Sequence, residues 1–139
     1  MVLVERFTKD ENMLSDLKNT IEQMQAKVPV TIFHLRGWLD GQSEADFVKW
    51  ANEAYEKGTR YLLLDLSELD TLTSAGMRAI QKVYNMYTPK GTDKEFPRLK
   101  LASAPPPVYH ALKIAGFLQS IPMFESVQSA LDSFEAPAT

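Results

Sequence analysis

The 139-residue sequence contains no cysteine, which excludes disulfide bonds and thiolate metal sites. Only two histidines occur, His34 and His110, so few residues could act as the base of a catalytic pair. No apolar run approaches the roughly 20 residues that a membrane-spanning helix needs. The N-terminus becomes acidic and polar too early for a signal peptide, so we expect a cytoplasmic protein.

An excess of positive charge is also missing. The chain has 15 Lys and Arg residues against 18 Asp and Glu residues, a net charge of -3. No basic cluster indicates a nucleic acid or a membrane surface as a partner. Hydrophobic residues make up 45% of the sequence, enough for the core of one domain of this length.

The usual catalytic motifs are absent as well. Leu72 occupies the first glycine position that a Gly-x-Ser-x-Gly elbow around Ser74 would need, and no Walker A spacing occurs. Asp65, Glu68 and Asp70 are close in sequence, but Asp65 falls inside an expected strand and the other two in a solvated turn. A phospho-aspartate receiver would need an acidic pair after its first strand, and none stands out. The sequence therefore predicts a protein that is not an enzyme and binds no metal or cofactor.

What is present is an alternation of strand and helix patterns. Such alternation is typical of an α/β layer, and we expect one small domain with a mixed, mostly parallel sheet of about five strands. The helices should lie mainly on one face. The expected strands are residues 2–7, 30–37, 61–66, 99–102 and 121–124, and the expected helices are about 9–27, 44–57, 74–87, 106–115 and 127–134.

The first of these helices rests on two local signals. Thr8 and Glu11 have the spacing of a capping box, and Pro29 would end the helix. An apolar stripe at helical spacing follows: Leu14, Leu17, Ile21, Met24 and Val28. The sequence thus divides into an N-terminal strand and helix extension, residues 1–28, and a main domain, residues 29–139.

The helix from Ser74 to Tyr87 has the clearest two-sided pattern. Its expected buried face is Gly76, Ala79, Ile80, Val83, Tyr84 and Tyr87, and its polar stripe is Ser74, Arg78, Gln81 or Lys82, and Asn85. Ser74 can cap the helix through its side-chain oxygen. A phosphate on Ser74 would lie at the positive end of the helix dipole, where Arg78, one turn on, could meet it. The helix start is therefore suitable for a phosphorylation switch that a partner reads.

Several segments, taken in chain order, resemble one protein family. They are Gly37-Trp38-Leu39-Asp40, Asp65-Leu66-Ser67, Thr73-Ser74-Ala75-Gly76, Gly116-Phe117 and Ala130-Leu131. Over residues 29–134 the sequence resembles the STAS domain family of bacterial anti-sigma factor antagonists. The resemblance implies a STAS-like fold and a non-enzymatic regulator of transcription.

The resemblance also implies a switch and its partners. A serine kinase that acts as an anti-sigma factor would bind the unphosphorylated protein and phosphorylate Ser74, with Thr73 as the second choice. A PP2C-like phosphatase would then reset it. The expected partner-binding residues are Asp40, Gly41, Arg78, Lys82 and Asn85.

A second hypothesis remains open. In the Asp-Ser-Ser-Gly variant of the family loop, the accepting serine aligns with Ala75, which cannot carry a phosphate. The protein would then be a constitutive interaction or scaffold module in a stress-signalling assembly. The N-terminal extension could cover the sheet, contact a partner or mediate a homodimer.

Overall fold

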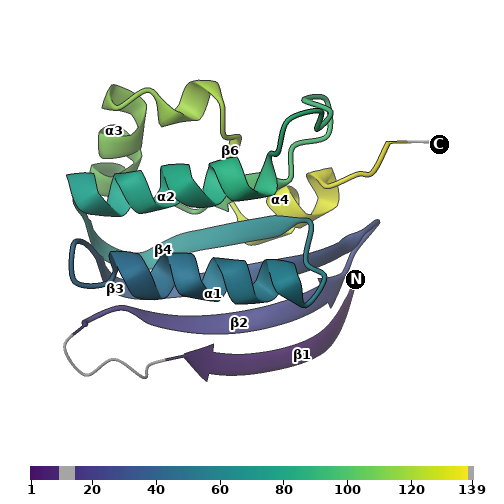
Figure 1. Cartoon of the computed structure of the whole chain (residues 1–139), viewed down its shortest axis with the longest axis horizontal. Helices are drawn as coiled ribbons and strands as arrows, with labels where there is room; N and C mark the ends of the chain where they lie inside the picture. The colour runs from purple at the N-terminus through teal and green to yellow at the C-terminus, as the bar shows by residue number, and fades with distance from the viewer. Residues whose placement is uncertain (10–14, 138–139) are drawn as a thin grey trace.

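In the part of the chain that the structure describes, the expected alternation of strands and helices folds into a six-stranded sheet with four α-helices (Figure 1). The computed structural model describes residues 1–9 and 15–137. The strands are β1 (Val2–Lys9), β2 (Lys18–Gln25), β3 (Pro29–Leu39), β4 (Leu62–Leu72), β5 (Leu99–Ala102) and β6 (Met123–Phe124). The helices are α1 (Glu44–Glu56), α2 (Ser74–Tyr87), α3 (Pro106–Ile114) and α4 (Val127–Ser133), with a 3-10 turn η1 (Phe117–Gln119).

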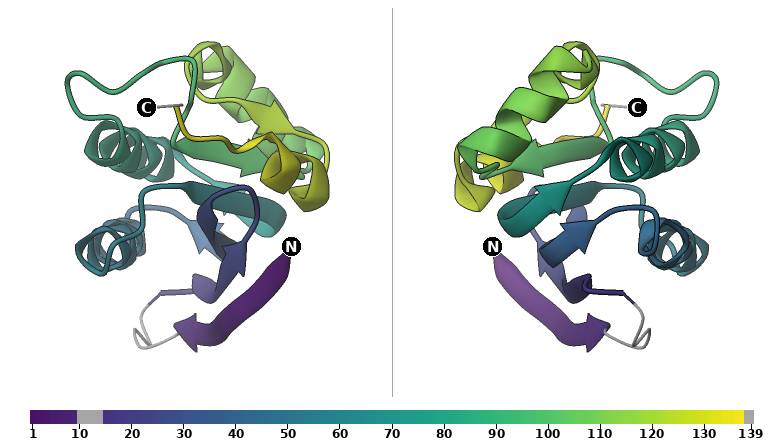
Figure 2. Two further views of the ribbon diagram at one scale, coloured as in Figure 1. Left: turned by 90° about the vertical axis from the view of Figure 1, so that its right-hand side faces the viewer. Right: turned by 90° about the vertical axis from the view of Figure 1, so that its left-hand side faces the viewer.

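The strands lie in the sheet in chain order, β1-β2-β3-β4-β5-β6. The first two pairings are antiparallel and the remaining three are parallel, which confirms the predicted mixed sheet. Parallel neighbours need crossover connections, and these are right-handed almost without exception. Because the parallel strands all advance in one direction, the crossover helices α1, α2 and α3 contribute to the same core (Figure 2).

The larger core lies between the sheet and these three helices. Phe33 of β3 meets Phe47 of α1 edge to face, with ring centroids 6.4 Å apart, and both side chains are fully buried. The buried Tyr87 of α2 donates its hydroxyl to the Ala51 carbonyl oxygen of α1 at 2.8 Å. Each large apolar side chain buried in this way contributes roughly 1.5–3 kcal/mol. The core therefore holds α1 and α2 side by side over the same strands.

A smaller core lies on the other face, under α4. Val30 and Ile32 of β3 and Leu63 of β4 pack there with Phe134, which follows α4. These residues belong to the amino-terminal halves of β3 and β4. Over the carboxyl-terminal halves of both strands, no helix of the described residues covers this face.

The predicted helix over residues 9–27 is wrong, because β2 occupies most of the second half of this range and pairs with both β1 and β3. Glu11 and Leu14, which supported the helix, lie outside the described residues. Leu17 and Ile21 join the larger core, whereas Met24 and Val28 join the smaller one, so the apparent helical stripe is divided between two faces of a sheet. This additional strand makes six strands in place of about five, and strand pairing overrides the local preference for helix.

Candidate functional site

Two loops meet at the carboxyl ends of the parallel strands β3 and β4. Leu39 at the end of β3 is in register with Leu72 at the end of β4, and the Thr73 N–H donates to the Leu39 carbonyl oxygen at 3.1 Å. Each strand then leads into a helix, α1 or α2. This register places the Asp40–Gly41 turn beside Ser74, at the edge where sites gather in α/β sheets.

The start of α2 is capped by Thr73, not by Ser74. Thr73 has an extended backbone, and its Oγ1 accepts a hydrogen bond from the Gly76 N–H at 3.3 Å. The suggestion that Ser74 caps the helix is therefore wrong, because threonine already fills the position from which a side-chain oxygen reaches the first turn. Ser74 is the exposed first residue of α2, and its hydroxyl bonds to none of the residues that the structure describes. The cap thus leaves the Ser74 hydroxyl accessible.

Gly76 lies where α2 passes closest to the end of β3. A Cβ atom at this position would lie 2.1 Å from the Leu39 carbonyl oxygen and 2.9 Å from Cδ1 of Leu72. Neither distance is compatible with a side chain, so glycine is what allows the backbones to approach this closely. By contrast, a Cβ atom on Gly41 would meet Ala75 at an ordinary 3.9 Å. The close approach at Gly76 fixes the position of Ser74 relative to β3.

The turn before α1 is closed by Asp40 and Ser43. One Asp40 carboxylate oxygen accepts from the backbone N–H groups of Gln42 and Ser43, both at 3.1 Å. The buried Ser43 hydroxyl accepts from the Asp40 N–H at 2.9 Å and donates to the Trp38 carbonyl oxygen at 2.8 Å. The carboxylate of Asp40 is therefore committed to the turn, and its contribution to the site is to hold Gly41 exposed beside α2.

A polar surface extends from Ser74 along α2. Arg78, Lys82 and Asn85 are all exposed, as their spacing predicts. Lys82 Nζ forms an ion pair with Glu44 of α1 at 2.8 Å. The hydrogen bond from Lys82 lowers the pKa of Glu44, desolvation opposes it, and the charges of Lys82 and Arg78 add to the decrease. We call Gly41, Ser74, Arg78, Lys82 and Asn85 the α1–α2 surface.

A groove between the two helices continues this surface. Its volume is about 570 Å³, and its lining is Gly41, Glu44, Ala45, Val48, Lys49, Asn52, Lys82 and Met86. Val48 and Met86 are apolar and the residues around them are polar, a combination typical of protein–protein interfaces.

Sequence reasoning missed Trp38, which is 44% exposed just before the turn. An exposed tryptophan beside a turn is a signal of binding, because tryptophan is enriched among residues that dominate interface energies.

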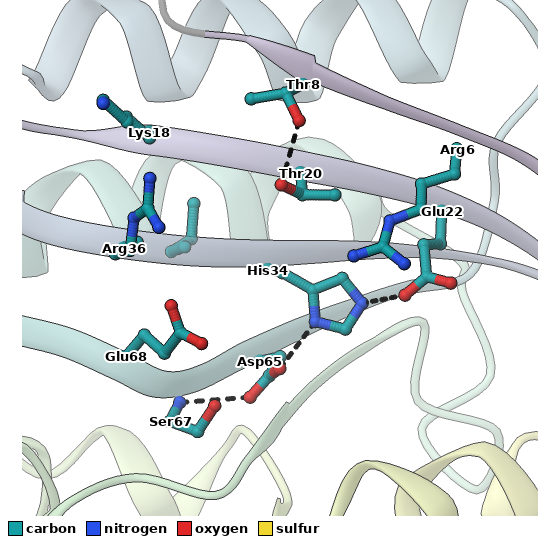
Figure 3. Close-up of a pocket in the computed structure, with 11 residues that line it drawn as sticks. Arg6, Thr8, Lys18, Thr20, Glu22, His34, Arg36, Asp65, Ser67 and Glu68 are labelled. Carbon is teal, nitrogen blue, oxygen red and sulfur yellow. Dashed lines mark hydrogen bonds and ion pairs between the residues drawn. The ribbon is translucent and has the colours of Figure 1, made fainter.

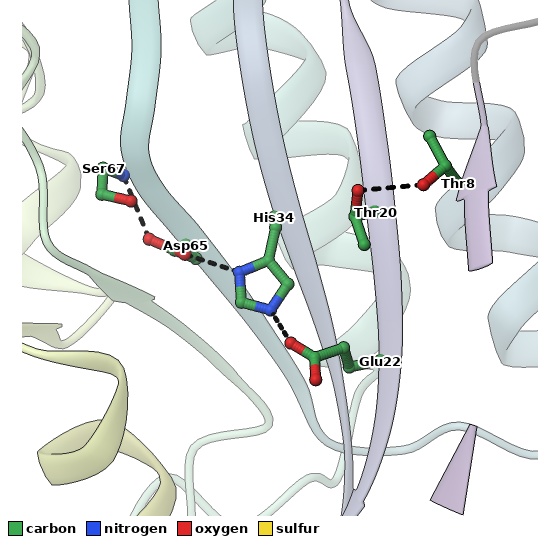
Figure 4. Close-up of polar contacts among 6 residues, drawn as sticks. All are labelled: Thr8, Thr20, Glu22, His34, Asp65 and Ser67. Atoms are coloured by element: carbon green, nitrogen blue, oxygen red, sulfur yellow. Dashed lines mark hydrogen bonds and ion pairs between the residues drawn. The ribbon is translucent and has the colours of Figure 1, made fainter. Parts of the chain in front are cut away.

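A polar cluster that the sequence did not predict lies on the sheet face away from α1 and α2 (Figure 4). His34 of β3 bonds through Nδ1 to the Asp65 carboxylate of β4 at 2.6 Å and through Nε2 to Glu22 of β2. Burial opposes protonation of His34, but the hydrogen bonds and charges of Asp65 and Glu22 outweigh it and raise its pKa above 6.5. Desolvation would raise the pKa of Asp65, but the hydrogen bonds from His34 and Ser67 lower it. The cluster joins three neighbouring strands.

These shifts predict how stability depends on pH. A raised folded-state pKa means that the contribution of His34 is complete below about pH 6.5 and is lost as the pH rises through the folded value. The lowered pKa of Asp65 means that its contribution to stability is lost only in acid, as the pH falls through the folded-state value. Urea denaturation should therefore show wild type losing stability between about pH 6 and about pH 9. At the lower pH, His34→Gln should be about 1–3 kcal/mol less stable than wild type. Its free energy of unfolding should also differ less between the two pH values than that of wild type.

The matched control for this prediction is His110→Gln, because His110 is exposed on α3. This variant should follow the wild-type pH dependence. Equal pH dependence of wild type and His34→Gln would contradict the assignment of the effect to the cluster.

Neither a metal site nor a membrane-spanning helix is found in the part of the chain that the structure describes. Among residues 1–9 and 15–137, no group of three His, Cys, Asp or Glu residues is placed to hold a metal ion. None of the helices in these ranges combines the length and apolarity needed to cross a membrane.

Comparison with known proteins assigns the fold. The family profile of the STAS domain matches residues 22–130. A Thermotoga maritima protein provisionally assigned as an anti-sigma factor antagonist superposes with a TM-score of 0.70 at 18% identity, covering 81% of this chain and 90% of its own. An anti-sigma factor antagonist from Mycobacterium paratuberculosis superposes with a TM-score of 0.68 at 17% identity, and the match covers 83% of this chain and 91% of that protein. The unphosphorylated form of the anti-sigma factor antagonist SpoIIAA superposes with a TM-score of 0.65 at 15% identity, and the match covers 82% of this chain and 93% of SpoIIAA.

At these identities the structural likeness concerns the fold alone. SpoIIAA of Bacillus has also been solved in its phosphorylated form. No curated protein matches the sequence.

Proposed function

The chain belongs to the STAS domain family, and we propose that it is an anti-sigma factor antagonist that binds a serine-kinase anti-sigma factor and is released when Ser74 is phosphorylated. The observation that carries the proposal is the exposed Ser74 hydroxyl at the first turn of α2, beside the Asp40–Gly41 turn. The likeness to SpoIIAA supports it, because SpoIIAA is an anti-sigma factor antagonist with both an unphosphorylated and a phosphorylated form.

The electrostatics of the α1–α2 surface also support a switch at Ser74. A phosphate there would add about 1.5–2 negative charges to a surface that now carries two exposed cations, Arg78 and Lys82. The free N–H groups of the first turn of α2 and the nearby Arg78 would stabilise it. The fold would therefore tolerate the phosphate, whereas a partner that fits the uncharged serine would meet repulsion and a desolvation cost.

The setting of this switch follows from the same proposal. A PP2C-like phosphatase would restore the Ser74 hydroxyl, and the protein would act in the cytoplasm of a bacterium as a regulator of transcription. The outer edge of β1 is not paired with another strand of the described structure, so it is where a homodimer would form.

A constitutive scaffold is the second candidate, and Ala75 is the observation that favours it. Ala75 occupies the position at which one variant of the family loop carries its acceptor serine, and it has no hydroxyl. In this case Ser74 would serve only as part of an uncharged contact surface. The two candidates differ in whether Ser74 ever carries a phosphate.

The binding surface can be tested by reversing one charge. Arg78→Glu should weaken binding to a serine-kinase anti-sigma factor of the same organism by about tenfold, because it replaces an exposed cation at the centre of the α1–α2 surface. Isothermal titration calorimetry measures the effect, and far-ultraviolet circular dichroism should remain unchanged. Lys113→Glu, a comparable charge reversal at an exposed position on α3, should bind like wild type. Similar affinity for both variants would place the binding surface elsewhere.

A further inference from the structure

The sheet face opposite α1 and α2 changes character along β3 and β4. Val30, Ile32 and Leu63 are apolar and packed with the α4 region. His34 and Asp65 continue the same face two residues further along each strand, because side chains alternate between faces. Beyond these two residues a pocket of about 380 Å³ with a mainly polar lining lies on this face, and no helix of residues 1–9 and 15–137 covers it (Figure 3).

The strand register arranges the polar side chains of this pocket in three rows. Arg6 lies opposite Glu22 in the first row, Thr8, Thr20, His34 and Asp65 form the second, and Lys18, Arg36 and Glu68 form the third. A bulge in β4 lets Glu68 pair with Arg36 although Asp65 pairs with His34. The Ser67 N–H inside the bulge donates to Asp65 at 3.0 Å, and Ser67 also lines the pocket.

Two of the three carboxylates that line the pocket bond to His34, whereas its three long cationic side chains have no ion-pair partner in the described structure. Glu22 and Asp65 both bond to His34. Arg6, Lys18 and Arg36 form no ion pair with any residue that the structure describes, and neither does Glu68. With His34 protonated, four positive charges face three negative ones. With His34 neutral the two signs balance at three each, so the lining carries no excess of negative charge in a protein whose net charge is -3.

Lys18 and Arg36 are the least expected pair in this arrangement. They lie directly opposite each other on the antiparallel strands β2 and β3. Like charges in directly opposed positions destabilise a sheet, so folding alone does not account for this pair. Figure 3 places both on one side of His34 and Arg6 on the other, so the cations flank the pocket.

The lining also limits what the pocket can bind. The imidazole ring of His34 is held by two carboxylates, and no described Trp, Tyr or Phe lines the pocket, so no aromatic ring is placed to stack on a nucleobase. Leu35 is the one apolar residue of the lining, which argues against a lipid chain. Guanidinium groups match the oxygens of phosphate in a bidentate manner, and the hydroxyls of Thr8, Thr20 and Ser67 can add hydrogen bonds. The volume corresponds to a small molecule.

We propose that this pocket binds a small phosphate oxyanion, either free phosphate or the phosphate group of a small polyol phosphate, between Arg6 on one side and Lys18 and Arg36 on the other. In a polyol phosphate, the hydroxyl groups would donate to the unpaired Glu68. The site lies on the face away from the α1–α2 surface and is independent of Ser74. A ligand here would join β1, β2 and β3 and stabilise the N-terminal hairpin against the rest of the sheet.

Calorimetric titration in a phosphate-free buffer tests the proposal, with inorganic phosphate and glycerol 3-phosphate as separate probes and sodium chloride at matched ionic strength as the reference. Phosphate or its ester should bind at one site. Arg36→Gln and Arg6→Gln should each weaken binding by about tenfold or more. Lys90→Gln, at an exposed loop position outside the pocket, should bind like wild type. Tighter binding of glycerol 3-phosphate than of phosphate would identify the ester as the ligand, and the reverse would identify the free ion.

Amide chemical-shift mapping by NMR locates the bound probe even if a variant is poorly folded. Shifts should concentrate at Thr20, His34 and Ser67 of the wild-type protein. Shifts concentrated at Ser74 and Gly76 would instead mean that the start of α2 binds the anion, and this would overturn the proposal. Equal heats of titration for phosphate and for sodium chloride would also overturn it. So would an equal loss of phosphate affinity in Arg36→Gln, Arg6→Gln and Lys90→Gln.

Discussion

Replacing Gly76 by alanine is expected to lower the free energy of unfolding by about 3 kcal/mol, at the upper end of the range for an overpacked contact. The new Cβ atom would lie 2.1 Å from the Leu39 carbonyl oxygen, a backbone atom that cannot move without displacing β3. Helix propensity alone would favour alanine by about 1 kcal/mol, so the two effects have opposite signs. Urea denaturation followed by circular dichroism measures the difference.

Gly41→Ala is the matched control for this substitution. Its Cβ atom would meet Ala75 at 3.9 Å, and Gly41 does not have a positive φ angle, so its stability should stay within about 0.5 kcal/mol of wild type. If Gly76→Ala were as stable as wild type, α2 and β3 would not approach as closely as the structure indicates. Since the same contact positions Ser74, Gly76→Ala should also weaken partner binding.

Ser74→Glu is expected to weaken binding to the kinase by about 10- to 100-fold, which corresponds to about 1.4–2.8 kcal/mol. The carboxylate imitates part of the charge of a phosphate, and it stands on the exposed first turn of α2, within the α1–α2 surface. Thr73 supplies the cap, so the substitution should leave the helix start intact. Calorimetry measures the affinity, and a thermal melt close to that of wild type shows that the fold is kept.

Two further variants complete this test. Ser74→Ala should bind the kinase as wild type does but should not be released when ATP is added, because it has no hydroxyl at the proposed acceptor. Ser120→Glu adds the same charge at an exposed position after η1 and should bind normally. If Ser74→Glu bound as tightly as Ser74→Ala and ATP released neither wild type nor variant, the constitutive scaffold would become the better account.

The sequence predicted α2 and its surroundings well because the relevant signals there are local. The apolar residues from Gly76 to Tyr87 recur at helical spacing, and the helix has the predicted limits, Ser74–Tyr87. The exposed positions of Arg78, Lys82 and Asn85 follow from the same periodicity. Thr73 was overlooked as the cap because threonine and serine are both suitable for that position, and only the backbone angles decide between them.

The features that the sequence did not predict depend on strand pairing over long distances. His34 bonds to Glu22, 12 positions away, and to Asp65, 31 positions away, and nothing local to any of the three indicates the register. The same limitation explains β2, whose Lys, Glu, Gln and Met residues favour a helix until β1 and β3 pair with both of its edges. The charged pocket could be recognised only after β1, β2, β3 and β4 had been placed side by side.

Phosphorylation at Ser74 is the central claim, and mass spectrometry tests it most directly. The wild-type protein is incubated with ATP and a serine-kinase anti-sigma factor of the same organism, and its peptides are then mapped, with Ser74→Ala treated in parallel. The proposal predicts one added phosphate, located on Ser74 in wild type and missing from the variant, together with dissociation of the phosphorylated protein from the kinase. An unmodified wild-type protein in a stable complex, or a phosphate on Thr73 or another residue, would contradict it.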